Sequence, residues 1–183
     1  MSAAELAALQ PGDLSDDVLE QALQAAMKLD GRELAARFAE ALVARPPQPE
    51  RPDRFPWYAQ LVQRAIRDGD TAAALDYINA GEKDDCEHNE GRRRNDYELR
   101  RAEIHARRGD AEEAQGLFER LIERAPSELR YRGSAAEAML SARQGSRALQ
   151  FAEAGLAKAR AANDRDSEHY FMELVAAAKK QGA

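Results

Sequence analysis

The sequence predicts an all-α fold made of stacked antiparallel helix pairs, and three observations support this prediction. Good helix formers such as Ala, Leu, Glu and Arg dominate, whereas Val, Ile and Thr, which favour strands, together number only nine. Apolar residues recur at i, i+3 and i+4 in successive segments, as expected for helices with one buried face. Glycines at positions 31, 69, 109 and 145 follow one another at intervals of 38, 40 and 36 residues, which is the period range of helix-pair repeats.

The first helix pair is predicted within residues 15–45. Ser15 has the side chain of an N-cap, and apolar residues at helical spacing follow it. Asp30-Gly31 then predicts a turn. Asp30 and Glu33 have the spacing of a capping box, so the second helix of the pair is expected to begin there.

A proline-rich connector is predicted over residues 46–56. The segment from Arg45 to Pro56 contains five prolines, Pro56 included, and proline removes a backbone donor and keeps the preceding residue out of the helical region. The chain is therefore expected to contain an N-terminal helical hairpin (1–45), this extended connector, and a series of repeats with a C-terminal capping helix (57–181). Together they are predicted to form one continuous domain.

The second helix pair is predicted to start with a helix over residues 57–68. Gly69-Asp70 marks the turn into its partner helix, which is expected to end near Gly81. The following segment, residues 82–90, holds five carboxylates and one lysine. This acidic segment is predicted to be an exposed loop or a frayed helix end.

The central helix pair is predicted over Asp96–Pro126. Gly109-Asp110 interrupts its helical pattern, Asp110 and Glu113 again have capping-box spacing, and the proline ends the second helix. A further pair with a turn near Gly145 is expected after it. A final helix over residues 167–180 is predicted to cap the stack.

The small and large apolar residues of these pairs form a pattern that suggests a family. The pattern consists of Gly109-Asp110, Ala114, Phe118, Leu121 and Pro126 in the central pair, and of Tyr58, Leu61, Val62, Ala65, Gly69-Asp70, Ala74 and Ile78 in the preceding one. It resembles the tetratricopeptide repeat (TPR) family. The resemblance implies a right-handed α-α superhelix with a concave groove that binds peptides or proteins. The first helix of the central pair departs from the pattern, with Glu98, Arg101 and His105 where the family usually has Trp, Leu and Tyr.

The resemblance also implies a set of groove residues, which lie on the first helix of each repeat. They mix charged and apolar side chains: Gln63, Ile66, Arg67, Leu99, Arg100, Glu103, Arg107, Arg130, Glu137 and Leu140. We therefore expect a non-catalytic interaction module, an adaptor or scaffold, with a protein or peptide partner. An acidic peptide is expected to meet Arg100, Arg107 and Arg130. For each residue, a merely solvated helical face is the alternative.

Two other functions stay open. The first is a structural protein that self-associates through its apolar stack. The second is a metal-dependent module around Cys86 and His88, although a lone Cys-x-His lacks the roughly four ligands of a structural zinc site. The sequence has no recognisable set of nucleophile, base and orienting group and no phosphate-binding loop, so neither catalysis nor a cofactor or bound metal is expected.

Charge and hydropathy limit the partners and the location. The net charge of −6 disfavours nucleic-acid binding, because affinity for phosphate comes from concentrated positive charge. No apolar run reaches the roughly 18 residues of a membrane span. The first residues lack the basic and apolar parts of a signal peptide, and the chain has one cysteine. We therefore expect a cytoplasmic protein.

Overall fold

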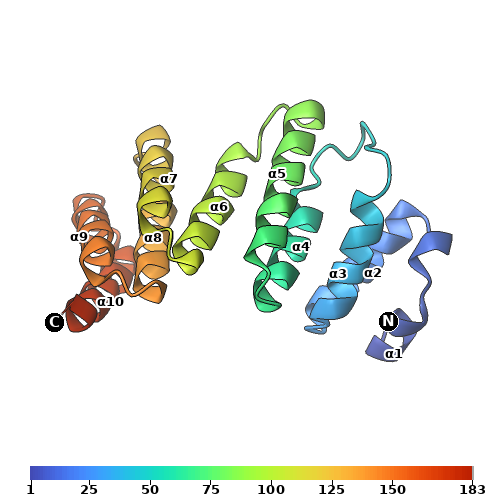
Figure 1. Cartoon of the computed structure of the whole chain (residues 1–183), viewed down its shortest axis with the longest axis horizontal. Helices are drawn as coiled ribbons and strands as arrows, with labels where there is room; N and C mark the ends of the chain where they lie inside the picture. The colour runs from blue at the N-terminus through green and yellow to red at the C-terminus, as the bar shows by residue number, and fades with distance from the viewer. Residues whose placement is uncertain (183) are drawn as a thin grey trace. The chain divides into compact units, whose positions relative to one another are not determined.

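The computed structural model describes residues 1–182, and over this range the protein is all-α, without strands (Figure 1). The predicted fold class is confirmed, because helices that follow one another in the chain pack against each other. The helices are α1 (Ala3–Ala8), α2 (Asp16–Lys28), α3 (Arg32–Val43), α4 (Phe55–Arg67), α5 (Thr71–His88), α6 (Arg94–Arg108), α7 (Ala111–Arg124), α8 (Leu129–Ser141), α9 (Gly145–Ala161) and α10 (Arg165–Gly182), with a short 3-10 helix, η1 (Pro11–Asp13), after α1.

The chain forms two compact units, Met1–Tyr97 and Glu98–Ala183, which we call the N-terminal and the C-terminal unit. The division falls inside α6. In the first unit, α3 packs against both α2 and α4, and α4 packs against α5; in the second, α8 packs against α7, α9 and α10. The sequence places its boundaries at residues 45 and 57 instead, and one continuous domain stays a prediction.

The core of the N-terminal unit forms where the apolar faces of α2, α3 and α4 meet. Leu19 and Leu23 of α2 belong to the same buried cluster as Phe38 of α3 and Leu61 of α4, and each of these side chains is at most 1% exposed. Leu6 of α1 is fully buried in this cluster too. The apolar periodicity therefore identified the centre of these buried faces, whereas Val18 and Met27, which the same periodicity assigns to the buried face of α2, are exposed.

Two arginines of this unit bind main-chain carbonyl groups far away in the sequence. Arg37 donates hydrogen bonds to the carbonyls of Leu6 (2.9 Å) and Leu9 (3.1 Å), at the C-terminal end of α1. Arg45 donates to the carbonyl of Leu14, just before α2. The last carbonyls of a helix lack intrahelical donors, so a guanidinium group at that end supplies donors and offsets the negative end of the helix dipole.

A third arginine, Arg54, plays the same part for α3 from a buried position. It is only 4% exposed and donates to the carbonyls of Leu42 (3.0 Å) and Val43 (2.8 Å). It also forms a 2.7 Å ion pair with Asp84 of α5, and its guanidinium lies 5.3 Å from the ring centre of Trp57. The chain between α3 and α4 is non-helical, as its prolines predict, but this end of it is firmly anchored.

Helix α5 is longer than the sequence predicts. It does not end near Gly81 but continues to His88, so the predicted loop or frayed end over residues 82–90 is wrong for most of that segment. Gly81 lies inside the helix, and the ring of Tyr97 occupies the space that a side chain at this position would need. A Cβ atom at Gly81 would lie 2.6 Å from the Tyr97 hydroxyl oxygen.

The acidic segment is also not fully exposed. Asp85 is only 4% exposed, and Asn89 only 5%. The Asp85 carboxylate accepts hydrogen bonds from Asn89 Nδ2 (2.7 Å) and from the backbone N–H of Arg93 (2.9 Å). These bonds hold the turn between α5 and α6, so one of the predicted solvent-facing carboxylates has a structural role.

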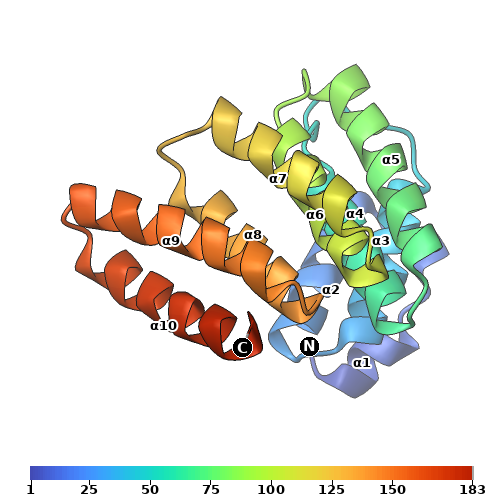
Figure 2. The same cartoon turned by 60° about the vertical axis from the view of Figure 1, so that its left-hand side comes forward.

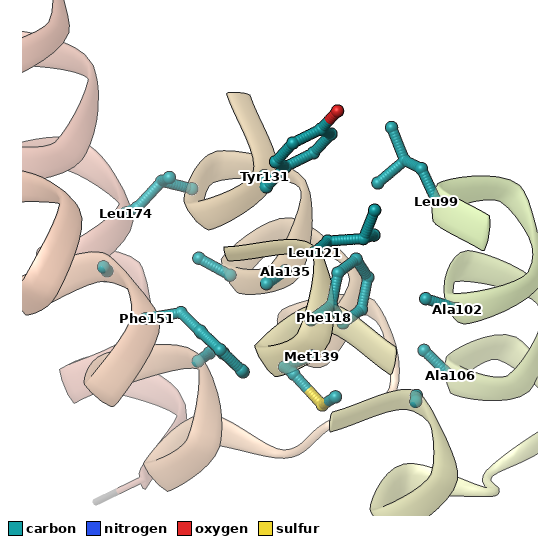
Figure 3. Close-up of a cluster of buried hydrophobic side chains, with 14 of the residues drawn as sticks. Leu99, Ala102, Ala106, Phe118, Leu121, Tyr131, Ala135, Met139, Phe151 and Leu174 are labelled. Carbon is teal, nitrogen blue, oxygen red and sulfur yellow. The ribbon is translucent and has the colours of Figure 1, made fainter. Parts of the chain in front are cut away.

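The core of the C-terminal unit places small residues of one helix against large residues of the next (Figure 3). Ala102 and Ala106 of α6 face Phe118 of α7, as tightly crossing helices require. Phe118 also makes an edge-to-face contact with Phe151 of α9, at a centroid distance of 6.1 Å. Leu121 is fully buried beside them.

Glycines inside helices allow α9 and α10 to lie close together (Figure 2). A Cβ atom at Gly155 would overlap the ring of Phe171, and one at Gly145 would lie 2.9 Å from the backbone nitrogen of Gly182. The sequence predicts a turn near Gly145, and the turn does lie there, between the end of α8 at Ser141 and the start of α9. The residue with positive φ in that turn is Arg143 (58°), and Gly145 is instead the first residue of α9.

The predicted capping box of the first helix pair is wrong as well. Asp30 occupies the left-handed region (φ 52°), and its carboxylate binds the guanidinium of Arg32. Gly31 is the N-cap of α3, and no side chain caps this helix. The turn is where the sequence places it, but Asp30 and Glu33 do not cap the helix that follows.

The two Gly-Asp turns use the same residues in different ways. Gly69 and Gly109 both have positive φ, as turn glycines should. The Asp70 carboxylate accepts a 2.9 Å hydrogen bond from the backbone N–H of Ala73 and thereby caps α5. Asp110 is the N-cap residue of α7, but its side chain makes no cap bond and pairs with His105, 3.1 Å away, so the predicted capping box with Glu113 is wrong.

Candidate functional site

A hollow of about 240 Å³ lies between α6 and α8 of the C-terminal unit. Both helices contribute residues spaced three and four apart, which share one helix face. The lining residues are, from α6, Arg100, Glu103 and Arg107 and, from α8, Ser134, Glu137, Ala138 and Ser141. All four charged residues among them belong to the predicted groove set. We refer to this feature as the α6–α8 hollow.

The charges of the α6–α8 hollow are only partly paired. Arg100 Nη1 lies 2.9 Å from Glu103 Oε2, less than one turn further along the helix. Arg107 is exposed and has no ion-pair partner in the described part of the chain. The hollow therefore contains one internal ion pair and one guanidinium group that is available to an acidic ligand.

The fourth charged residue, Glu137, is held by a tyrosine that the sequence does not predict at the site. The hydroxyl of Tyr170, on α10, donates a 2.8 Å hydrogen bond to Glu137 Oε1. Its ring lies over Gly133, where a Cβ atom would be 2.8 Å from the hydroxyl oxygen. Burial, followed by this contact with Glu137, raises the pKa of the Tyr170 phenol, so the proton stays on the tyrosine.

Polar residues replace aromatic packing where α6 departs from the family pattern. Glu98 is only 8% exposed and forms salt bridges with Arg120 (3.3 Å) and Arg124 of α7. A buried carboxylate needs such partners, since an unpaired buried charge is strongly destabilising. These ion pairs fix α6 on α7 and so orient the helix face that carries Arg100, Glu103 and Arg107.

The other predicted groove residues lie outside the hollow. Leu99 is 6% exposed and belongs to the core, so it presents little surface to a partner. Leu140 packs against the same core. Arg130 is exposed, and its guanidinium lies 5.1 Å from the ring centre of Tyr131. The remaining three belong to α4 of the N-terminal unit: Gln63 and Arg67, which are exposed, and Ile66, which is half-buried.

The sequence analysis did not name Ser134, Ser141 or Tyr170 as site residues, and only the two serines could have been predicted from helical spacing. Ser134 and Ser141 precede and follow Glu137 by three and four residues, so helical spacing alone would have placed them on its face. Tyr170 is 33 residues away from Glu137. No local spacing rule connects the two, because the contact depends on how α10 packs against α8.

Two larger and more open hollows lie elsewhere in the molecule. One, of about 680 Å³, surrounds the turn between α6 and α7 and includes His105, Asp110 and Arg147. The other, of about 640 Å³, runs along α2 and includes Asp17 and Lys28. Neither contains a predicted groove residue.

The Cys86 and His88 segment shows no metal-binding arrangement. Both side chains are exposed on the last turns of α5. Among residues 1–182, no group of three or more His, Cys, Asp and Glu side chains is placed to hold a metal ion. Over the same range, no helix combines the length and the apolar character needed to cross a membrane.

Comparison with known proteins adds no family to this picture. No protein-family model matches the chain, and no curated protein matches it in sequence. The resemblance to the tetratricopeptide repeat family therefore stays a prediction from the residue pattern.

Proposed function

We propose that this chain is a non-catalytic, TPR-like interaction module whose α6–α8 hollow binds a short segment of a partner protein. The observation that carries the proposal is the convergence of Arg100, Glu103, Arg107 and Glu137, from two helices, on one hollow. Their spacing on each helix keeps these side chains on the same face over about two turns. Such a face suits an extended segment that lies across both helices.

The size of the hollow favours a peptide over a small molecule. At about 240 Å³ it is smaller than the roughly 300–1,000 Å³ of typical small-molecule sites. A peptide needs to insert only one or two side chains and gains further contacts along the helices. The exposed Arg107 favours an acidic residue in that segment, through a charge-assisted hydrogen bond.

The balance of charge disfavours other partners. The hollow carries two arginines and two glutamates, so it lacks the concentrated positive charge that phosphate backbones require. We therefore propose a protein or peptide partner rather than a nucleic acid. A cytoplasmic location and the lack of membrane binding belong to the same proposal. No cofactor or metal takes part in this function, and the chain is not an enzyme.

The proposal is tested by selecting peptides from a randomised display library against the whole chain. The affinity of an enriched peptide is then measured by fluorescence polarisation with Arg107→Glu. We expect binding to weaken about tenfold or more, because like charges then meet at the hollow. Lys158→Glu, an equal charge reversal at an exposed position on α9, is the matched control and should leave affinity unchanged. The proposal is rejected if no peptide is enriched, or if an enriched peptide binds both variants as tightly as the unmodified chain.

Self-association is the second candidate function, and exposed apolar side chains favour it. On α2, Val18 is 37% exposed and Met27 46%; Leu29, just after this helix, is 49% exposed. Met172 on α10 is 48% exposed. Light scattering coupled to size exclusion decides the point, since a monomer mass over a wide concentration range rejects self-association.

A further inference from the structure

We propose that Tyr170 is a positioning residue that fixes Glu137 in the α6–α8 hollow, so that the hollow selects a partner segment with a basic side chain. This inference rests on the proposed function and adds a second charge requirement to it. Arg107 takes an acidic residue of the segment, and Glu137 takes a lysine or arginine.

Glu137 is held in one orientation by a hydrogen bond from Tyr170. A glutamate on an exposed helix face normally samples several rotamers. Here Oε1 accepts a 2.8 Å hydrogen bond from the Tyr170 hydroxyl. The tyrosine itself is fixed, because its ring fills the space over Gly133 and makes an edge-to-face contact with Phe171 at a centroid distance of 5.2 Å.

Glu137 can still accept further hydrogen bonds. A carboxylate is an acceptor with about four lone-pair sites on two oxygens. Tyr170 uses one oxygen, and Oε2 has no hydrogen-bond or ion-pair partner among residues 1–182. Glu137 is therefore oriented yet still able to bind a donor from a ligand.

Neither arginine of the hollow competes with a ligand for Glu137. Arg100, the other basic residue at the hollow besides Arg107, is already paired with Glu103 at 2.9 Å. Because neither arginine forms an ion pair with Glu137, its negative charge is left for the partner. A cationic donor forms a charge-assisted bond to a carboxylate that is roughly twice as strong as a neutral one. A lysine or arginine is therefore preferred over a neutral side chain.

The experiment uses the enriched peptides of the display selection. Each lysine or arginine of a peptide is replaced by glutamine, and affinities are measured with the unmodified chain, Glu137→Gln and Tyr170→Phe. With the unmodified chain we expect one replacement to weaken binding about tenfold. We call the affinity for the original peptide divided by the affinity for the glutamine-substituted peptide the affinity ratio. This ratio should fall to about one with Glu137→Gln and to an intermediate value with Tyr170→Phe, which keeps the ring over Gly133. Tyr131→Phe, on α8 but outside the hollow, is the matched control and should leave the ratio unchanged.

The outcomes separate this inference from the function on which it rests. Peptides that need Arg107 but bind equally well without any basic residue overturn the inference and leave the proposed function intact. If Glu137→Gln lowers the affinity ratio to one but Tyr170→Phe leaves it unchanged, the positioning role of Tyr170 is overturned. Without any enriched peptide, both proposals fail.

A second measurement needs no ligand. The ionisation of the tyrosines is followed by near-ultraviolet absorbance as the pH rises, and Tyr170→Phe identifies the contribution of Tyr170. If Glu137 contacts the phenol in solution, Glu137→Gln lowers the pKa of Tyr170, because a negative neighbour no longer opposes its ionisation. An unchanged pKa of Tyr170 overturns the contact.

Discussion

The two units hold their helices together by different means. In the N-terminal unit, Arg37, Arg45 and Arg54 reach main-chain carbonyls between 9 and 34 residues away. In the C-terminal unit, Gly145 and Gly155 let α9 and α10 approach until a Cβ atom would collide. Donors at helix ends are thus prominent in the first unit and glycine approaches between helices in the second, although Gly81 of the first unit also makes room for a ring, that of Tyr97.

A repeated helix-pair pattern therefore does not determine the interactions that stabilise each pair. Both units share the Gly-Asp turn and the apolar periodicity. The periodicity specifies which face is buried. The periodicity does not specify whether a distant guanidinium group binds the last carbonyl groups of a helix, or how closely the axes of two packed helices approach.

The largest effect is expected for Arg54→Ala in the N-terminal unit. The change leaves the last carbonyls of α3 without donors and Asp84, on α5, without its partner, so we expect a loss of about 3 kcal/mol in unfolding free energy. Urea denaturation measures it. Arg92→Ala removes an exposed arginine that pairs with Glu90 and should cost less than about 0.5 kcal/mol. Equal losses for the two variants would contradict a special role for the buried arginine.

The corresponding change in the C-terminal unit is Gly155→Ala. Alanine favours a helix by about 1 kcal/mol over glycine, but here its Cβ atom overlaps the buried ring of Phe171. Overpacking of this kind costs roughly 1–3 kcal/mol, so we expect a net destabilisation in thermal and urea unfolding. Gly116→Ala, in α7, meets nothing closer than 3.6 Å and should stabilise by about 0.5–1 kcal/mol. The comparison fails if both variants change stability in the same direction.

Alkaline pH should weaken both units through the same arrangement of a tyrosine over a glycine. Burial raises the pKa of Tyr97, over Gly81, and of Tyr170, over Gly133, above the unfolded value of about 10. Below that pH, both states keep the proton and these groups add no pH dependence. Above it, the unfolded state ionises first, so stability falls by up to about 1.4 kcal/mol per pH unit for the buried Tyr97. The fall is smaller for Tyr170, because this side chain is 37% exposed and solvent screens it.

Tyr97→Phe and Tyr170→Phe should each reduce this alkaline loss. Urea denaturation at pH 8 and at pH values above about 10 measures it for the unmodified chain and for each variant. If either tyrosine ionised at its ordinary pKa in the folded state, its removal would leave the pH dependence unchanged.

The smallest effect is expected at the two Gly-Asp turns. Asp70→Ala removes a cap bond to the backbone N–H of Ala73 and should cost about 1 kcal/mol. Asp110→Ala removes two half-exposed contacts, with His105 and with Arg108 (3.3 Å), and should cost no more than about 0.5 kcal/mol. Urea denaturation of both variants at neutral pH makes the comparison. Equal costs would show that the two aspartates have the same role.

The sequence predicted local features of the fold better than features that depend on packing. Helical periodicity and Gly69-Asp70 are local, and both predictions are confirmed. Gly81 and Gly145 look like any other glycine in the sequence, because what distinguishes them is a neighbour from another helix. Asp85 could not be distinguished from the other carboxylates of its segment for the same reason, since its backbone partner is eight residues away.

The candidate site divides in the same way. The family resemblance included Arg100, Glu103 and Arg107 in one groove set, and these three side chains line the same hollow. Their role in binding stays a prediction. The contact between Tyr170 and Glu137 joins two helices that are not neighbours in the chain, so no spacing within either helix reveals it. Residues that define a surface can thus be predicted before those that hold it in place.

The position of Trp57 has a practical consequence for studying this protein. It is the only tryptophan of the chain, it is 7% exposed, and the guanidinium of Arg54 lies against its ring. Its fluorescence therefore reports on the junction of α3, the connector and α4 alone, whereas far-ultraviolet circular dichroism averages over every helix. Denaturation curves that coincide for the two signals would mean that the chain unfolds in one cooperative step, and curves that separate would reveal a state in which one half of the chain has melted before the other.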